Sequence, residues 1–406
     1  MRSIEIFAGA GGLGMGVSLA GFHAEEVVEW DADCCDTLRD NRQRGIAPVS
    51  LWPLTQGDVR GIDFSRHEAR VHLVTGGPPC QPFSIGGKHG AHKDTRDMFS
   101  HAVRAVREVK PQAFIFENVK GLTRATFRNY FEYIRLQMMH PEIASRSEES
   151  WEEHLRRLEK HETSGSRAGL TYNVIVHLAN AADYGVPQRR ERVFFVGFRS
   201  DLNIAWSFPP QTHSAEALAW AQYRDGSYWD RHAALWNDRA FSETTRARAW
   251  KISERPSAEP WMTVRDALVG LPDPEKHPRL ARGHFNHRFQ SGARSYTGHT
   301  GSPLDEPAKT LKAGVHGVPG GENMLLRPDG SVRYFSVRES ARLQTFPDDF
   351  AFHGSWTESM RQLGNAVPVR LARVVAEDVM RHLEKKVDQT AIQSARQDKP
   401  RAKHRN

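Results

Sequence analysis

The chain has 406 residues, of which 39% are hydrophobic and 26% are charged, the balance of an ordinary globular protein. At about 150 residues per domain, this length predicts two or three folding units. No run approaches the roughly 18 apolar residues that a membrane span needs, and no signal-peptide pattern opens the chain. Three cysteines exclude a disulfide scaffold, and Cys34, Cys35 and Cys80 lack the spacing of a zinc site. We therefore expect a soluble cytoplasmic protein with no membrane partner and no bound metal.

The formal net charge of +7 is concentrated at the C-terminus. Residues 385–406 carry seven Lys or Arg residues and two Asp residues, without an apolar pattern. This composition predicts a basic, disordered tail. Such a tail suits a nucleic-acid partner, although its commonest effect is to keep a protein soluble.

Strand-like and helix-like segments alternate along residues 1–199. Helical spacing occurs, for example, at Phe99, Ala102, Val103 and Val106. The alternation predicts an α/β fold in which helices cover both faces of a parallel sheet. A charged stretch at about 146–167 interrupts it and predicts a helical surface insertion. The short apolar runs that predict strands are 4–8, 27–30, 71–75, 113–117, 174–178 and 193–198.

The rest of the chain differs in composition and in the periodicity of its apolar residues. Residues 200–332 contain six of the ten Trp residues, many Pro, Gly and His residues, and no clear period. They predict a second, smaller and irregular domain. Periodicity returns afterwards, which predicts a hinge segment at 333–359 and a return to the first domain at 360–384.

A glycine-rich run, Gly9-Ala10-Gly11-Gly12-Leu13-Gly14, follows the first strand and opens a helix. Its glycines let the backbone approach a nucleotide closely. Glu29 lies twenty residues after Gly9, at the end of the second strand, where a carboxylate would meet ribose hydroxyls. Trp30 offers a flat face to an adenine ring, and Asp58 lies at the next strand end. This pattern predicts a nucleoside cofactor but does not separate a dinucleotide from S-adenosylmethionine.

Cys80 follows the strand at 71–75 in the run Gly-Gly-Pro-Pro-Cys-Gln-Pro-Phe-Ser, at the strand end where α/β folds bind their ligands. Glu117 ends the next strand, which we expect to lie beside the Cys80 strand. A Cys–Glu pair suits attack on an electron-poor heterocycle, because the acid can donate a proton to a ring nitrogen. Arg190 and Arg192 are two residues apart, just before a further strand, so their side chains would face the same way. They would hold a carbonyl oxygen or a phosphate at this site, unless the run is only a solvated basic turn.

These groups resemble, in order, the motifs of DNA cytosine-5 methyltransferases of bacterial restriction–modification systems. Residues 7–14 resemble the first motif of the family, and 338–347 and 364–368 resemble the ninth and tenth. The resemblance covers about 1–199 and 333–383, without circular permutation. The catalytic motifs are matched by Pro79-Cys80-Gln81, Glu117-Asn118-Val119 and Gln188-x-Arg190-x-Arg192.

The resemblance implies a Rossmann-like, S-adenosylmethionine-dependent methyltransferase domain at 1–199 and a target-recognition domain at 200–332. It also implies methylation of a cytosine flipped out of double-stranded DNA. Cys80 would add to carbon 6 of the base, Glu117 would protonate nitrogen 3, and carbon 5 would take the methyl group. Arg190 and Arg192 would hold the cytosine oxygen and position the other two side chains.

The resemblance further assigns residues to ligands. S-adenosylmethionine would contact Phe7, Ala8, Gly9, Gly11, Gly12, Leu13, Glu29, Trp30, Asp58, Val59, Pro79, Asn365, Ala366 and Val367. DNA would contact Gln81, Ser84, Arg96, Thr310 and Leu311, the last two forming a landmark of recognition regions. A loop at 316–323 is either a groove-entering element or a plain surface turn. We expect a monomer near the prokaryotic nucleoid, and a cognate restriction endonuclease that shares its site without needing to contact it.

Three other functions compete with DNA methylation as explanations of this sequence. A tRNA cytosine-5 methyltransferase of the same family would carry a Cys-Phe-Thr signature, but no cysteine follows Cys80. A NAD-dependent dehydrogenase would explain the glycine run and leave the Cys80, Glu117 and arginine motifs without a role. A non-catalytic DNA-binding regulator would need neither Cys80 nor Glu117. The sequence therefore favours the DNA methyltransferase, with the tRNA enzyme as the alternative.

Overall fold

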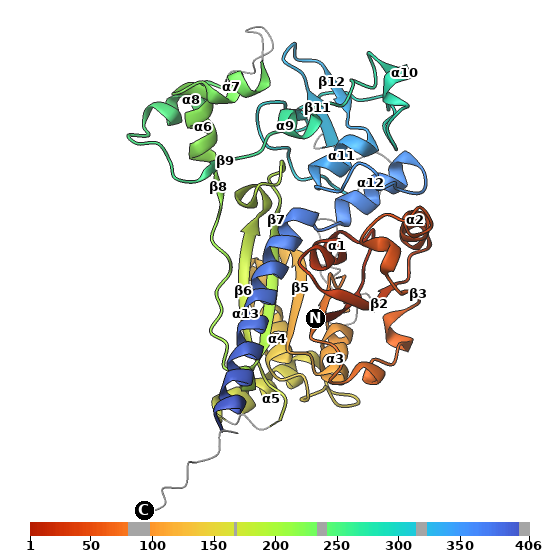
Figure 1. Cartoon of the computed structure of the whole chain (residues 1–406), viewed down its shortest axis with the longest axis vertical. Coiled ribbons are helices and arrows are strands. Elements are labelled where there is room, and N and C mark those ends of the chain that lie inside the picture. Colours follow the sequence, from red (N-terminus) through yellow and green to blue (C-terminus); the bar gives the residue numbers. More distant parts are fainter. Residues whose placement is uncertain (80–97, 166–168, 234–241, 314–322, 398–406) are drawn as a thin grey trace, which may run out of the picture.

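The computed structural model describes residues 1–79, 98–165, 169–233, 242–313 and 323–397. Within these ranges, a seven-stranded sheet of order β3-β2-β1-β4-β5-β7-β6 organises the first part of the chain (Figure 1). Its members are β1 (Arg2–Ile6), β2 (His23–Glu29), β3 (Leu54–Gln56), β4 (Leu73–Gly76), β5 (Ala113–Val119), β6 (Tyr172–Asn180) and β7 (Glu191–Arg199). The six predicted strands all occur, and β3 is an additional short strand ending just before Asp58.

Apolar side chains leave both faces of this sheet, which explains the apolar runs in its strands. In β5, Phe114 and Phe116 join one buried cluster, and Ala113 and Ile115 join another on the opposite face. The first cluster includes α3 (Phe99–Val109), α4 (Arg128–Met139) and α5 (Trp151–Thr163), and the second includes α1 (Gly12–Leu19) and α13 (Val369–Gln397). The predicted α/β fold with helices on both faces is confirmed. No helix in the described ranges is long and apolar enough to cross a membrane.

One strand departs from the predicted parallel sheet. β7 runs antiparallel to both of its neighbours, β5 and β6. Only residues 181–190 connect β6 to β7, which is too short for the crossover that a parallel pair needs. The expectation of a wholly parallel sheet is therefore wrong at this position. The antiparallel pairing brings the start of β7 beside the end of β5, where Glu117 lies.

Residues 200–212 run back along the sheet and pack on its second apolar cluster, and residues 213–334 form the upper part of the molecule in Figure 1, beyond one end of the sheet. Two small apolar clusters lie in this upper part, one around Tyr228 and Trp229 and one around Leu311 and Leu325, and the second also includes Phe335 and Leu343 from the segment that follows. We expected this domain to end at residue 332, but β12 begins at Val332 and ends at Tyr334, so a boundary after residue 332 would cut this strand. The elements are β8 (His213–Ser214), α6 (Ala215–Tyr223), α7 (Ser227–His232), α8 (Glu243–Trp250), β9 (Glu259–Pro260), α9 (Val264–Leu268), α10 (Pro278–Ala281), β10 (Ser302–Pro303), β11 (Met324–Leu326) and β12 (Val332–Tyr334).

The chain then returns to the sheet through α11 (Val337–Leu343), α12 (Trp356–Asn365) and α13. α13 packs so closely on α1 that a Cβ on Gly16 would lie 2.5 Å from the Ala372 Cβ. α13 also continues to Gln397. The expectation of a disordered tail beginning at Lys385 is therefore wrong for 385–397, which extend the helix.

Candidate active site

The glycine-rich turn joins β1 to α1 with the backbone conformation that its glycines predict. Gly9 and Gly11 have positive φ angles of 56° and 82°, and Phe7 has a φ of 58°. A Cβ on Gly9 would meet nothing within 4 Å, whereas one on Gly12 would lie 2.3 Å from the Val367 carbonyl oxygen. The turn therefore has free space beside Gly9, where a ligand could approach the backbone. Beside Gly12 it is packed against Val367.

Glu29 is held rigidly at the end of β2. Its carboxylate accepts hydrogen bonds from the backbone N–H groups of Gly9 (2.6 Å), Trp30 (2.9 Å) and Asp31 (2.8 Å). Burial raises the pKa of Glu29, and those hydrogen bonds partly oppose the increase. Trp30 beside it is 70% exposed, an unusual position for a large aromatic ring. A fixed carboxylate and an open aromatic face thus lie together at the glycine turn.

The other predicted cofactor residues are of two kinds. Asp58 follows β3 and makes an exposed ion pair with Arg60, which lowers its pKa, and Asn365 is exposed at the end of α12. Several others have side chains buried in the core, so only their backbones are available to a ligand. These are Ala8, Leu13, Val59, Ala366 and Val367.

Glu5 is a residue in this region that the predictions missed. Its side chain is buried beneath the glycine turn, where Oε1 accepts a hydrogen bond from the Gly14 N–H at 2.8 Å. Oε2 has no hydrogen-bond partner among the described residues. Burial raises the pKa of Glu5 to about 8. The signal in the sequence was a single acidic residue inside the apolar run of the first strand.

Glu117 near the end of β5 and Arg192 near the start of β7 form a buried ion pair. The Arg192 Nε lies 2.7 Å from the Glu117 Oε1, and the residues are 8% and 6% exposed. Burial raises the pKa of Glu117, and the positive charges of Arg192 and Arg190 counteract this. The pairing of β5 with β7 brings the two side chains together. Val119 lies opposite Arg192 in the register, and Glu117 is two residues before Val119 on the same face of β5, so it is a diagonal neighbour of Arg192.

The segment leading to Cys80 lies against Glu117. The Asn118 side-chain amide donates to the Pro78 carbonyl at 2.9 Å, and a Cβ on Gly77 would lie 3.4 Å from the Glu117 Oε2. The Met98 N–H donates to the Pro79 carbonyl at 3.1 Å, so residues 79 and 98 meet at this point. Cys80, Gln81, Ser84 and Arg96 lie outside the described residues, and their roles stay predictions.

Arg190 has a different environment from Arg192, although we expected both to hold the base. Its side chain is fully buried and donates to the carbonyl oxygens of Leu311 (3.0 Å), Gly364 (2.6 Å) and Ala366 (2.9 Å). Burial lowers the pKa of this guanidinium. Two of its nitrogens are thus committed to backbone groups, which favours a structural role over contact with the base.

Thr310 and Leu311, which we expected to contact DNA, have different environments. Leu311 is 1% exposed and belongs to an apolar cluster with Val264, Ala308 and Phe335. The Thr310 hydroxyl donates to the Arg189 carbonyl at 2.7 Å. The Leu311 side chain fills a core, so only its backbone is left for the predicted DNA contact, which stays a prediction.

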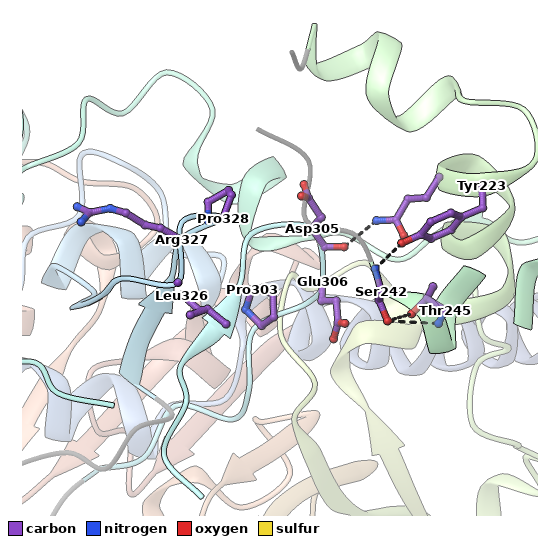
Figure 2. Close-up of a pocket in the computed structure, with 11 residues that line it drawn as sticks. Tyr223, Ser242, Thr245, Pro303, Asp305, Glu306, Leu326, Arg327 and Pro328 are labelled. Atoms are coloured by element: carbon purple, nitrogen blue, oxygen red, sulfur yellow. Dashed lines mark hydrogen bonds between the residues drawn. The ribbon is translucent and has the colours of Figure 1, made fainter. Parts of the chain in front are cut away.

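A separate cavity of about 310 Å³ lies within residues 200–334 (Figure 2). Tyr223, Asp305, Glu306 and Arg327 line it, together with several small or apolar residues. Its charged groups already have partners elsewhere, since Glu306 pairs with Arg189 and Arg327 pairs with Asp273 and Glu275. None of its lining residues belongs to the seven-stranded sheet, so it is distinct from the Glu29 and Glu117 sites.

The family model described as C-5 cytosine-specific DNA methylase matches residues 1–140 and 160–381. The chain belongs to this family. The unmatched residues 141–159 include the first part of α5, in the predicted insertion. As a C-5 cytosine-specific DNA methylase, the chain is an enzyme that methylates cytosine in DNA.

Individual methylases resemble it over most of their length. The Type II methyltransferase M.PspPI of Psychrobacter sp. is 31% identical over 388 residues, which cover 94% of this chain and 79% of that protein. M.Eco47II of Escherichia coli, also a Type II methyltransferase, is 28% identical over 393 residues, with the same two coverages.

Solved structures support the fold. A candidate DNA modification methyltransferase encoded within an E. coli prophage has a TM-score of 0.57 at 20% identity, covering 95% of this chain and 99% of that one. The Dnmt2 methyltransferase of S. pombe has a TM-score of 0.52 at 18% identity, with the same coverages. The methylase fold therefore extends through residues 200–334 as well as the sheet.

Proposed function

We propose that this methylase transfers a methyl group from S-adenosylmethionine to carbon 5 of a flipped cytosine in a specific double-stranded DNA sequence. We also propose that the product protects DNA in a restriction–modification system, as the Type II names of its relatives suggest. The observation that carries the proposal is the buried Glu117–Arg192 pair, packed against the segment that leads to Cys80.

The glycine turn fits the proposed cofactor. Its open side at Gly9, the rigid carboxylate of Glu29 and the exposed ring of Trp30 suit the backbone, ribose and adenine contacts of a nucleoside. When bound there, S-adenosylmethionine supplies the methyl group. Backbone groups of Phe7, Gly11, Gly12 and the buried residues beside them would complete the site, with Asp58, Pro79 and Asn365 at its edge.

The reacting side chains would act in a defined order. A Cys80 thiolate adds to carbon 6 of the cytosine while Glu117 donates a proton to nitrogen 3, which makes carbon 5 nucleophilic. After methyl transfer, loss of the carbon-5 proton and departure of Cys80 restore the aromatic ring. The raised pKa of Glu117 supports its role as a proton donor, and Arg192 supports a fixed carboxyl orientation.

The proposal extends to organisation and partners. Residues 1–199 with 360–384 would form the catalytic domain, and residues 200–332 would read the DNA sequence, with 333–359 as the hinge between them. A monomer acting in the prokaryotic cytoplasm fits this arrangement. A restriction endonuclease would recognise the same DNA site without needing to contact the methylase.

The decisive experiment traps the reaction intermediate. The wild type, incubated with S-adenosylmethionine and duplex DNA containing 5-fluorocytosine, should form a denaturation-resistant adduct, because fluorine blocks the final proton loss. Cys80→Ala should form none, and bisulfite sequencing of DNA from an expressing host should show one methylated sequence. Adducts with tRNA but not with duplex DNA would support the alternative substrate, and the absence of any adduct would contradict the mechanism.

A further inference from the structure

Two side chains next to β7 hold one residue of the recognition region by its backbone. The Leu311 N–H donates to the Gln188 Oε1 at 2.9 Å, and the Leu311 carbonyl accepts from the Arg190 Nη1 at 3.0 Å. Backbone hydrogen bonds from Ala308 to Pro187 (2.9 Å) and from Arg189 to Ala308 (2.8 Å) align the same two segments. We call residues 308–312 the recognition stem.

The next residue of the recognition stem is held in the same way from the other side. The Lys312 N–H donates to the Asn323 Oδ1, and the Asn323 Nδ2 donates to the Lys312 carbonyl, both at 2.9 Å. Asn323 is fully buried. Its amide is therefore already bonded to the backbone of Lys312, although Asn323 ends the loop at 316–323 for which a groove-entering role was one of the two alternatives.

The stem is also pressed against the end of α12. A Cβ on Gly364 would lie 2.3 Å from the Ala313 nitrogen and 2.5 Å from the Lys312 carbonyl carbon, so only glycine fits there. Arg190 bonds the Gly364 carbonyl with one nitrogen and the Leu311 carbonyl with another. Arg190 thus bridges the recognition stem and the end of α12.

We propose that Gln188, Arg190 and Asn323 are positioning residues that fix the recognition stem relative to the Glu117–Arg192 pair and so contribute to sequence discrimination. Arg190 and Arg192 are two residues apart. Arg190 donates a hydrogen bond to the recognition stem, and Arg192 forms the ion pair with Glu117. The position of the stem therefore decides which base pairs can be read while a cytosine lies at Glu117. Hydrogen-bonded readout of base edges depends steeply on such geometry. The proposal rests on the function proposed above.

The test compares three variants. Asn323→Ala removes the clamp on Lys312, and Arg190→Lys keeps a positive charge but loses the planar fork that bridges several carbonyls. Arg338→Lys is the matched control. Arg338 is also fully buried and donates to three carbonyls, those of Phe285, Pro347 and Phe350, none of which belongs to the stem.

For each variant, kcat/KM is measured on the duplex that the wild type methylates and on duplexes with one altered base pair. Thermal melting and calorimetry with S-adenosylmethionine report stability and cofactor affinity. We expect Asn323→Ala and Arg190→Lys to lower the ratio of cognate to altered kcat/KM at least ten-fold. Asn323→Ala should keep cofactor affinity within two-fold, and Arg338→Lys should keep the wild-type ratio.

Two outcomes would overturn the inference. Either the variants slow methylation of cognate and altered sites by the same factor, or Arg338→Lys loses as much discrimination as they do. If Arg190→Lys does not fold, Asn323→Ala decides alone. A wild type that binds S-adenosylmethionine but methylates no cytosine would instead contradict the proposed function, and this inference with it.

Discussion

Arg192 lies 2.7 Å from the carboxylate of Glu117, in a site where both residues are more than nine-tenths buried. Removal from water favours the protonated form of Glu117, while the guanidinium favours the ionised form. Burial is the larger effect, and the pKa of Glu117 stays above its ordinary value. The pair thus provides an acid that is both oriented and able to retain a proton, which suits donation to a ring nitrogen.

Glu117→Gln should therefore lower kcat for methylation by about 10²–10⁴-fold, the usual contribution of general acid catalysis. The amide fills the same volume but cannot transfer a proton to the base. Single-turnover methylation of the cognate duplex measures the effect, with calorimetry to verify unchanged cofactor binding. Glu191→Gln, at an exposed carboxylate that pairs with Lys120 at the start of β7, is the control. A Glu117→Gln enzyme with the wild-type rate would exclude Glu117 as the acid.

Glu29→Ala should weaken S-adenosylmethionine binding by about 1.5–3 kcal/mol, the range for losing a hydrogen bond to a charged group. The substitution also leaves the backbone N–H groups of Gly9, Trp30 and Asp31 without this acceptor, so thermal stability should fall as well. Isothermal calorimetry measures the affinity. Glu25→Ala, on the same strand but paired with Arg2 at the surface, should leave it unchanged. Equal affinities for Glu29→Ala and wild type would show that another acidic residue holds the ribose.

Glu5→Gln should remove a pH dependence of stability. The pKa of Glu5 is raised from 4.5 to about 8 on folding, so the folded state holds a proton that the unfolded state releases. The stability that this proton contributes is complete below about pH 4.5 and is lost as the pH rises to about 8. Between pH 5 and 9, the unfolding free energy of the wild type should fall relative to that of the variant by a few kcal/mol. Denaturant titrations at several pH values measure this, and parallel curves would contradict it.

Exchanging residues 200–331, which leaves β12 whole, for the matching region of another family member should move methylation to the donor's sequence. The chemistry at Glu117 is independent of the target, because every flipped cytosine presents the same ring. A donor with glutamine, arginine and asparagine equivalents of Gln188, Arg190 and Asn323 should give the most active chimera. Bisulfite sequencing of a plasmid library with randomised sites identifies the target. An active chimera that keeps the parent's sequence would place base readout in the first domain.

Much of the sheet could be predicted because its strands are buried on both faces and therefore read as apolar runs. β3 has only three residues, too few for such a signal. The reversed direction of β7 leaves no trace in its composition, since an apolar strand suits either direction. That direction follows instead from the length of the segment that joins β6 to β7.

Glu29 and Glu117 could be predicted as candidate site residues because each lies at or near the end of a strand, where side chains from separate strands meet. The roles of Arg190, Leu311 and Asn323 could not. Arg190 donates hydrogen bonds to carbonyls that are 121, 174 and 176 residues away in the sequence. The residues next to Arg190 in the sequence give no indication of such distant partners. An arginine that contacts a ligand and one that bridges carbonyls have the same sequence signal.

The contact between α1 and α13 has a consequence for the order in which the enzyme is assembled on the ribosome. Val367 and Ala372 pack directly against the glycine turn and its helix, so Gly12 and Gly16 complete their packing only after residues more than 350 positions further along the chain have been made. Domains usually fold as units during synthesis, N-terminal first. This one must wait, with the turn unsupported, until the residues beyond 365 have left the exit tunnel. We therefore expect a chain that ends before residue 365 to leave the glycine turn without the residues that pack behind it.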